Sequence, residues 1–395
     1  MTDWQRLETE VRSLVARKKF MSIEWKFYQK NKLKTEGIVN AEKSRIKFKT
    51  KDNPIYRIYS MTKPLISVAA LIGIERHKLH LADPLIKYLP IFENVAVHLS
   101  TGKKHRVKRQ ITILDLLTHN AGFSYGFNND CHIGKMYKKD KLIHNSSLKL
   151  KEFVEKIAQY PLAFQPGTQW KYSIATDVLA RVLEIIFNDS IEDILTTLIF
   201  KPLDMSDTSY FLSKEKYSRL MPIYGEPNLD LVFRETSPQV QQTEVDLKSF
   251  YSPNKNTYNA RGGHGLFSTA EDYGKFCKAL LADTYGKNPN LISKTILNEA
   301  LSNRIPRQQI PIKINGEARL GYGWNLLGRV NQAKKENGSK PAIKEFGWSG
   351  AATTYFWVEP NSKIIGIIMT QQLGQHYPLG EKLRAICTQT LNKKT

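Results

Sequence analysis

Strand-like segments lie at both ends of the chain, and this placement limits the folds that it can adopt. Residues 21–27 alternate apolar and polar side chains, which is typical of a strand with one buried face. Residues 353–372 read as two strands around a Glu-Pro-Asn-Ser turn. Amphipathic helix-like segments lie beside these strands, within residues 3–18 and 379–391. We therefore expect one antiparallel sheet built from both chain ends, with helices packed on its faces.

The long middle of the chain has a different pattern. Helix-like segments follow one another and are separated by proline and glycine breaks. The prediction is an α+β fold with a sheet subdomain, roughly residues 1–85 and 310–395, and an inserted, mainly helical subdomain, roughly residues 86–309. The cleft between two such parts is the expected place for a site.

The chain is strongly basic, with 59 Lys and Arg against 37 Asp and Glu and a net charge of +22 among 395 residues. The basic residues are spread along the chain, and no segment resembles a recognition helix or an aromatic stacking motif. The densest cluster, residues 103–110, reads as a solvated loop, with a docking patch as the alternative. We conclude that nucleic acid is an unlikely partner, and the oligomeric state stays open.

Cysteine spacing and hydropathy limit the chemistry and the location. Cys131, Cys277 and Cys387 lie far apart, without the spacing of a metal or redox motif. The first 19 residues contain no apolar core of signal-peptide length, and the longest apolar run is too short to span a bilayer. The expectation is a cytoplasmic protein that has no transmembrane segment.

A serine and a lysine stand at the start of a buried helix. Ser60 lies three residues before Lys63, and residues 65–74 are apolar almost all round. Pro64 fits only near a helix start. Residues three apart share a helix face, so the lysine can reach the serine. Burial and the positive end of the helix both favour the neutral amine, which can accept a proton. Alternatively, Ser60 is an ordinary N-cap and Lys63 an exposed residue.

Two further segments favour chemistry. Tyr172 follows a Pro-Gly turn and precedes another helix-like segment, so its phenol could pass a proton to a leaving group if it lies beside the serine and lysine. Gly350, within a strand-like segment, would let a substrate lie close to the backbone. Each of these residues could also be purely structural.

Six ordered stretches carry a resemblance to a known family. They are residues 56–90, 111–127, 161–184, 199–211, 262–281 and 346–360. The chain resembles the serine β-lactamase and penicillin-binding-protein superfamily, and within it the class C β-lactamase-like branch that includes the family VIII carboxylesterases. The resemblance covers residues from about Tyr56 to Gln372 and implies the same two-part fold.

The resemblance implies that no metal or organic cofactor is needed, and it implies a role for each matched residue. Ser60 would attack a carbonyl and form an acyl-enzyme, with Lys63 and Tyr172 sharing the general-base role and Tyr172 protonating the leaving group. The backbone N–H groups of Ser60 and Ala351 would form the oxyanion hole, each contributing roughly 3–4 kcal/mol.

Two departures from the family pattern concern the substrate. Ile174 stands where β-lactamases have the Asn of Tyr-x-Asn, and Trp348-Ser349-Gly350 replaces Lys-Thr-Gly. Both changes remove groups that bind a carboxylated lactam, so we expect a small-molecule ester or amide substrate and favour a carboxylesterase. His264, in a glycine-rich loop near the cleft in this family, is expected near the substrate as a residue that fixes the loop.

Several alternatives remain open. Within the superfamily they are a β-lactamase, a D-stereospecific peptidase and an acyltransferase, because all of them use the same acyl-enzyme. A different class is a non-catalytic scaffold that keeps the fold and uses its basic surface. The Gly-x-Ser-x-Gly elbow of other serine hydrolases is excluded, because the string at 347–351 lacks its second glycine. A triad through His119 is disfavoured, because His119 reads as a helix-end residue.

Overall fold

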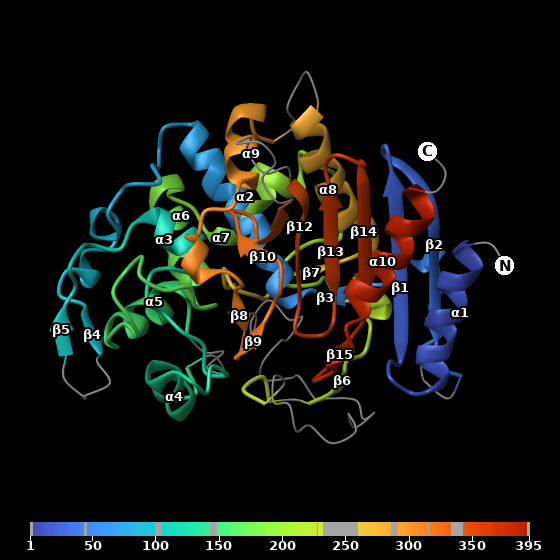
Figure 1. The fold of residues 1–395 in the computed structure, drawn as a ribbon, viewed down its shortest axis with the longest axis horizontal. Coiled ribbons are helices and arrows are strands. Elements are labelled where there is room, and N and C mark those ends of the chain that lie inside the picture. Colours follow the sequence, from blue (N-terminus) through green and yellow to red (C-terminus); the bar gives the residue numbers. More distant parts are fainter. Residues whose placement is uncertain are drawn as a thin grey trace.

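One large antiparallel sheet organises the protein in a computed structural model (Figure 1). The structure describes residues 3–42, 46–98, 104–142, 148–226, 228–231, 260–285, 291–314, 316–332 and 343–392. The sheet has seven strands in the order β10-β11-β12-β13-β14-β1-β2. The N-terminal strand β1 pairs with the C-terminal strand β14, with Trp25 opposite Ile368. The predicted α+β class, with a sheet built from both chain ends, is confirmed.

The strands of this sheet are β1 (Ser22–Gln29), β2 (Lys32–Asn40), β10 (Tyr322–Trp324), β11 (Arg329–Gln332), β12 (Ile343–Ser349), β13 (Tyr355–Glu359) and β14 (Ile364–Met369). Four smaller two-stranded sheets are formed by β3 (Tyr56–Arg57) with β7 (Phe267–Ser268), β4 (Ala96–His98) with β5 (Lys104–Arg106), β6 (Tyr224–Gly225) with β15 (Gln372–Leu373), and β8 (Lys313–Ile314) with β9 (Glu317–Ala318).

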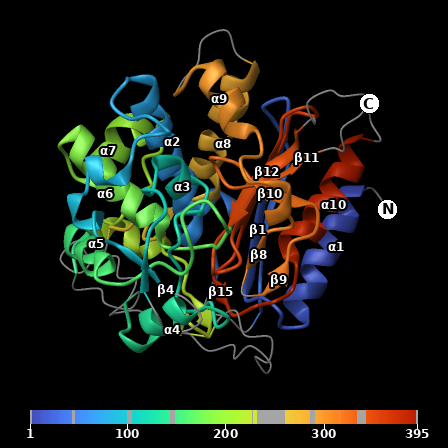
Figure 2. The same cartoon turned by 60° about the vertical axis from the view of Figure 1, so that its left-hand side comes forward.

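Helices cover both faces of the sheet. Their bounds are α1 (Asp3–Ala16), α2 (Thr62–Glu75), α3 (Ile113–Leu117), α4 (His132–Lys139), α5 (Leu150–Ala158), α6 (Ala175–Phe187), α7 (Ile191–Leu195), α8 (Ala270–Tyr285), α9 (Lys294–Leu301) and α10 (Leu379–Asn392). The terminal helices α1 and α10 share a core with one face (Figure 2), and α8 packs against β1 and β14 on the other. Helices α2 to α7 lie to one side of the sheet (Figure 1).

The expectation that residues 21–27 form a strand with one buried face is wrong in one respect, because every residue of β1 is buried. Lys26 shows how a polar side chain of β1 is accommodated away from water. Lys26 Nζ lies 2.7 Å from Glu36 and 3.0 Å from Glu271 of α8, so two carboxylates satisfy the buried ammonium. The alternating polar residues of β1 therefore belong to a second buried face, on which Lys26 is ion-paired.

None of the helices in the described part of the chain is long and apolar enough to cross a bilayer. The compartment and the predicted boundaries of the two subdomains remain predictions.

Gly366 of β14 should tolerate no side chain, because a Cβ there would overlap the indole ring of Trp357 on β13. Both residues belong to the centre of the sheet, where neighbours cannot move apart cheaply. We expect Gly366→Ala to lower the free energy of unfolding by about 1–3 kcal/mol, measured by denaturant unfolding. Gly274→Ala in α8 is the control, since its Cβ would approach only the hydroxyl of Tyr28, at 3.2 Å. Equal stability of the two variants would contradict this packing.

Candidate active site

The predicted nucleophile lies in a sharp turn between a strand and a helix. Ser60 occupies a short 3-10 turn, Tyr59–Met61, which follows β3 and leads directly into α2. The preceding residue, Tyr59, is buried and has φ = 45°, a left-handed conformation that a bulky residue adopts only when its surroundings enforce it. The fold therefore fixes the direction of the Ser60 side chain.

Lys63 is buried within reach of this serine. Its side chain leaves the first turn of α2, its Nζ lies 3.2 Å from Ser60 Oγ, and it donates a hydrogen bond of 2.7 Å to the carbonyl of Gly263. Burial lowers the pKa of Lys63 to about 7, although the charge of Asp177 acts in the opposite direction. A large fraction of the amine is therefore neutral near pH 7, as the sequence led us to expect.

Tyr172 completes the group. Its hydroxyl accepts a hydrogen bond of 3.0 Å from the indole N–H of Trp348, and Lys63 Nζ lies 4.7 Å from the centre of its ring. Burial raises the pKa of Tyr172, while its interactions with Ser60 and Trp348 oppose that rise. The phenol therefore keeps its proton at neutral pH and is suited to donate it.

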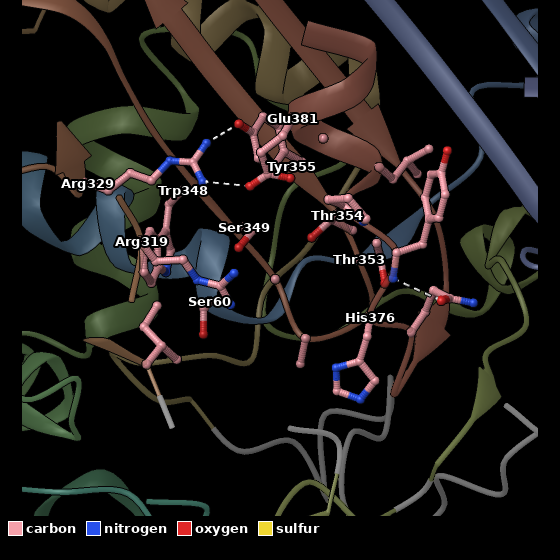
Figure 3. A pocket seen from close by; sticks show the side chains of 18 of the residues that line it. Ser60, Arg319, Arg329, Trp348, Ser349, Thr353, Thr354, Tyr355, His376 and Glu381 are labelled. Carbon is pink, nitrogen blue, oxygen red and sulfur yellow. Dashed lines mark hydrogen bonds and ion pairs between the residues drawn. The ribbon is translucent and has the colours of Figure 1, made fainter. Parts of the chain in front are cut away.

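A cavity of about 200 Å³ opens at Ser60 (Figure 3). Five of the predicted residues line it, in addition to Ser60 itself: Tyr172, Trp348, Ser349, Gly350 and Ala351. The remaining walls come from the β8–β9 hairpin, from β11 and β13, and from the segment 374–381 that leads into α10. The cavity thus joins the turn before α2, the end of β12 and the start of α10.

Gly350 has a packing role in addition to the one expected. A Cβ at Gly350 would lie 2.5 Å from the carbonyl oxygen of Ile58 and would overlap the hydroxyl of Thr354. The glycine therefore lets the end of β12 approach the nucleophile turn, as well as lining the cavity. Beside it, the amide of Ala351 finds no hydrogen-bond acceptor among the described residues, so it is free to donate to a substrate.

Two predicted substrate contacts do not reach the cavity. Ile174 is fully buried in the core at the start of α6, and it is absent from the cavity wall because its side chain packs inward. His264 is half-buried beside Gly263 and is also absent from that wall. His119 is buried, with Nδ1 3.2 Å from Ser173 Oγ and its ring edge-on to Tyr172. Burial and the charge of Lys63 hold the pKa of His119 far below its usual value, so this imidazole stays neutral.

Other residues near the site were missed in the sequence. The ring centre of Tyr125 lies 5.2 Å from Lys63 Nζ, and Trp324 packs edge-on against Trp348 with 4.6 Å between ring centres. Arg319, at the end of the β8–β9 hairpin, lines the cavity and pairs with Glu317. An acidic residue in the first turn of the mostly apolar helix segment 175–187 was the one available signal for Asp177, whereas the others depend on tertiary packing.

Among the described residues, no three His, Cys, Asp or Glu side chains are arranged to hold a metal ion. The absence of a cofactor requirement remains a prediction.

Replacing the buried amine should stabilise the protein. In the unfolded chain Lys63 keeps its proton up to about pH 10.5, whereas the folded pKa is about 7, so the unfolded state binds more protons between these values. The free energy of unfolding of wild type therefore rises with pH through that window. Below pH 7 the buried amine is charged and lowers the free energy of unfolding by its full amount. We expect the free energy of unfolding of Lys63→Met at pH 7 to exceed that of wild type by about 1–3 kcal/mol. This difference should become smaller as the pH rises toward 10.5.

Denaturant unfolding at several pH values measures this difference. Lys26→Met is the control, because Lys26 is also buried, at 7% exposure against 3% for Lys63, but is paired with two carboxylates, and its removal should destabilise the protein. If Lys63→Met were less stable than wild type at pH 7, the burial of the Lys63 amine without a directly bonded carboxylate would not be a net cost to stability.

The chain is similar in sequence to known esterases and in fold to a solved hydrolase structure. Esterase EstB of Burkholderia gladioli is 25% identical over 89% of this chain and 86% of its own. A lovastatin esterase of Penicillium rubens is 26% identical over 80% of this chain and 79% of its own. The solved structure of EstCE1, described as a hydrolase with promiscuous acyltransferase activity, superposes with a TM-score of 0.77 at 21% identity, covering 97% of this chain and 98% of that one, which shows the shared fold.

The pattern of the family described as Beta-lactamase matches residues 8–386, nearly the whole chain. The predicted superfamily and its esterase relatives are therefore confirmed. The chain belongs to the Beta-lactamase family and is a serine hydrolase.

Proposed function

We propose that the protein is a carboxylesterase that cleaves small, uncharged acyl esters through an acyl-enzyme on Ser60. The observation that carries the proposal is a group of three side chains beside one cavity. The Ser60 hydroxyl and the Tyr172 phenol line the cavity, and the buried Lys63 amine lies behind them, 3.2 Å from Ser60 Oγ. A nucleophile, a base of suitable pKa and a proton donor are the groups that acyl transfer needs.

In acylation, neutral Lys63 takes the proton of Ser60 while Oγ forms a bond to the ester carbonyl carbon. The pKa of about 7 suits this step, because the amine is then both available and basic. Tyr172 has a raised pKa, so it acts as the acid and gives its proton to the departing alkoxide. The ammonium of Lys63 then returns a proton to the phenolate, and the alcohol leaves.

The carbonyl oxygen gains negative charge in the tetrahedral intermediate. The backbone N–H groups of Ser60 and Ala351 are the proposed donors, and both residues line the cavity. Hydrolysis of the acyl-enzyme uses water as the nucleophile. The neutral amine of Lys63 takes one proton of the water, relayed through the Tyr172 hydroxyl, while the water oxygen bonds to the acyl carbon. The Lys63 ammonium then gives that proton to Ser60 Oγ as the bond between Oγ and the acyl carbon breaks and the carboxylic acid leaves. Atoms and protons balance without a further reactant.

The preference for esters rests on Trp348. Its side chain is 4% exposed, and its N–H is already bonded to Tyr172, so the site offers an aromatic wall where β-lactamases offer a cation. Ile174 supports the preference less directly than expected, because it is buried away from the cavity. The two curated relatives whose names describe esterases give further support.

Loss of the nucleophile tests the function directly. Ser60→Ala should abolish hydrolysis of p-nitrophenyl butyrate, by at least about 1000-fold in kcat, while thermal unfolding stays close to that of wild type. Nitrocefin in the same assay distinguishes the alternatives. Rapid nitrocefin cleavage would mean that the site accepts lactams, and residual ester cleavage in Ser60→Ala would place the chemistry elsewhere. No turnover of either substrate would favour a peptidase, an acyltransferase or a scaffold.

The hydrogen bond from Trp348 to Tyr172 should matter for rate rather than for binding. Trp348→Phe keeps an aromatic wall but removes the donor, so Tyr172 loses its fixed direction. We expect kcat for p-nitrophenyl butyrate to fall about 10-fold with little change in KM. Trp170→Phe is the control, because Trp170 also stacks on Tyr172 but its indole N–H has no acceptor among the described residues. A similar loss of kcat in both variants would show that packing, not the hydrogen bond, is responsible.

A further inference from the structure

Gly263 lies between the amine of Lys63 and the carboxylate of Asp177. Its carbonyl accepts the 2.7 Å hydrogen bond from Lys63 Nζ, and its amide donates a 3.0 Å hydrogen bond to Asp177 Oδ1. A Cβ at Gly263 would lie 2.7 Å from Asp177 Oδ2 and 3.3 Å from Lys63 Nζ. The two charged groups therefore lie within the separation of about 4–6 Å over which one charge alters the pKa of another.

Asp177 is a costly residue at this place. It belongs to the first turn of α6, its residue exposure is 1%, and most residues of that helix are apolar. Burial raises its pKa, and the charge of Lys63, the amides of Gly263 and Gly262 and the charge of Arg261 oppose the rise. A buried carboxylate is retained at such a cost only where its partners hold it, and the partners here lead to Lys63.

The groups that face the Lys63 amine come from several elements. They are Ser60 in the turn before α2, His119 after α3, Tyr125 in the following loop, Tyr172 before α6 and Asp177 on α6, with Arg261 acting on Asp177. His119 stays neutral and the two tyrosines keep their protons because burial raises their pKa values. Asp177 is thus the acidic group among these neighbours that can carry a full negative charge near the amine.

We propose that Asp177 is a positioning residue for the reaction: through the Gly263 peptide it holds the Lys63 amine beside Ser60, and through its charge it sets the pH at which that amine becomes neutral. The inference rests on the proposed function, in which Lys63 is the base. Asp177 does not touch the substrate, since it is absent from the cavity wall.

Two substitutions separate charge from position. Asp177→Asn removes the charge but keeps an oxygen that can accept from the Gly263 amide, so the acid limb of kcat/KM for p-nitrophenyl butyrate should move to lower pH by about 1 unit or more, with a modest loss of the plateau rate. Asp177→Ala removes the acceptor as well, and should show the same shift with a further loss of kcat. Glu155→Gln on the exposed face of α5 is the control and should leave the profile unchanged.

The pH profiles distinguish failure of the Asp177 proposal from failure of the proposed function. An acid limb at the wild-type position in both Asp177 variants would overturn the inference, even where their rates fall, because a merely structural role lowers activity at all pH values. Failure of the proposed function would look different: wild type itself would show no hydrolysis that depends on Ser60.

A second measurement covers variants that fold poorly. Charge coupling is reciprocal, so Lys63→Met should raise the pKa of Asp177 by the amount that Asp177 raises that of Lys63. In protein labelled with 13C at the aspartate carboxyl carbons, one buried resonance should titrate at higher pH in Lys63→Met than in wild type. Titration curves that coincide for every aspartate would contradict the proposed coupling.

Discussion

The burial of one lysine without a directly bonded carboxylate is the constraint on which the site depends. Lys63 loses its hydration in the first turn of α2, and within the described part of the chain only Ser60 Oγ and the Gly263 carbonyl accept hydrogen bonds from its amine. Desolvation brings its pKa close to neutrality. The burial of Lys63 thus lowers the stability of the fold and at the same time provides a neutral amine that can act as a base. Catalytic centres often show this combination of lower stability and higher activity.

The fold brings the other groups to this amine from distant parts of the chain. The turn before α2 supplies Ser60, the residues before α6 supply Tyr172, and the end of β12 supplies Trp348 and the Ala351 amide. The close approach of β12 to the turn depends on Gly350, whose missing side chain leaves room for the Ile58 carbonyl. Because β12 is a central strand of the sheet, its position relative to α2 is rigidly determined.

Much of this arrangement was predictable from sequence because it follows from local patterns. Alternating strands at both ends and the all-apolar helix after Lys63 predicted the sheet and the buried amine. Tertiary packing decided the rest: the exposed second face expected for β1 is covered by α8, and Ile174 turns into the core. The short strands β10 and β11 carry too few residues to show a period, and the link from Lys63 through Gly263 to Asp177 joins residues that no local pattern connects.

Direct observation of the acyl-enzyme tests the central claim. Native protein mixed with p-nitrophenyl butyrate is quenched in acid within the first turnovers, digested, and mapped by mass spectrometry. We expect one butyryl group, carried by the peptide that contains Ser60, with its amount falling as the ester is exhausted. Steady ester hydrolysis with no butyryl group on Ser60, or with the group on another side chain, would contradict it.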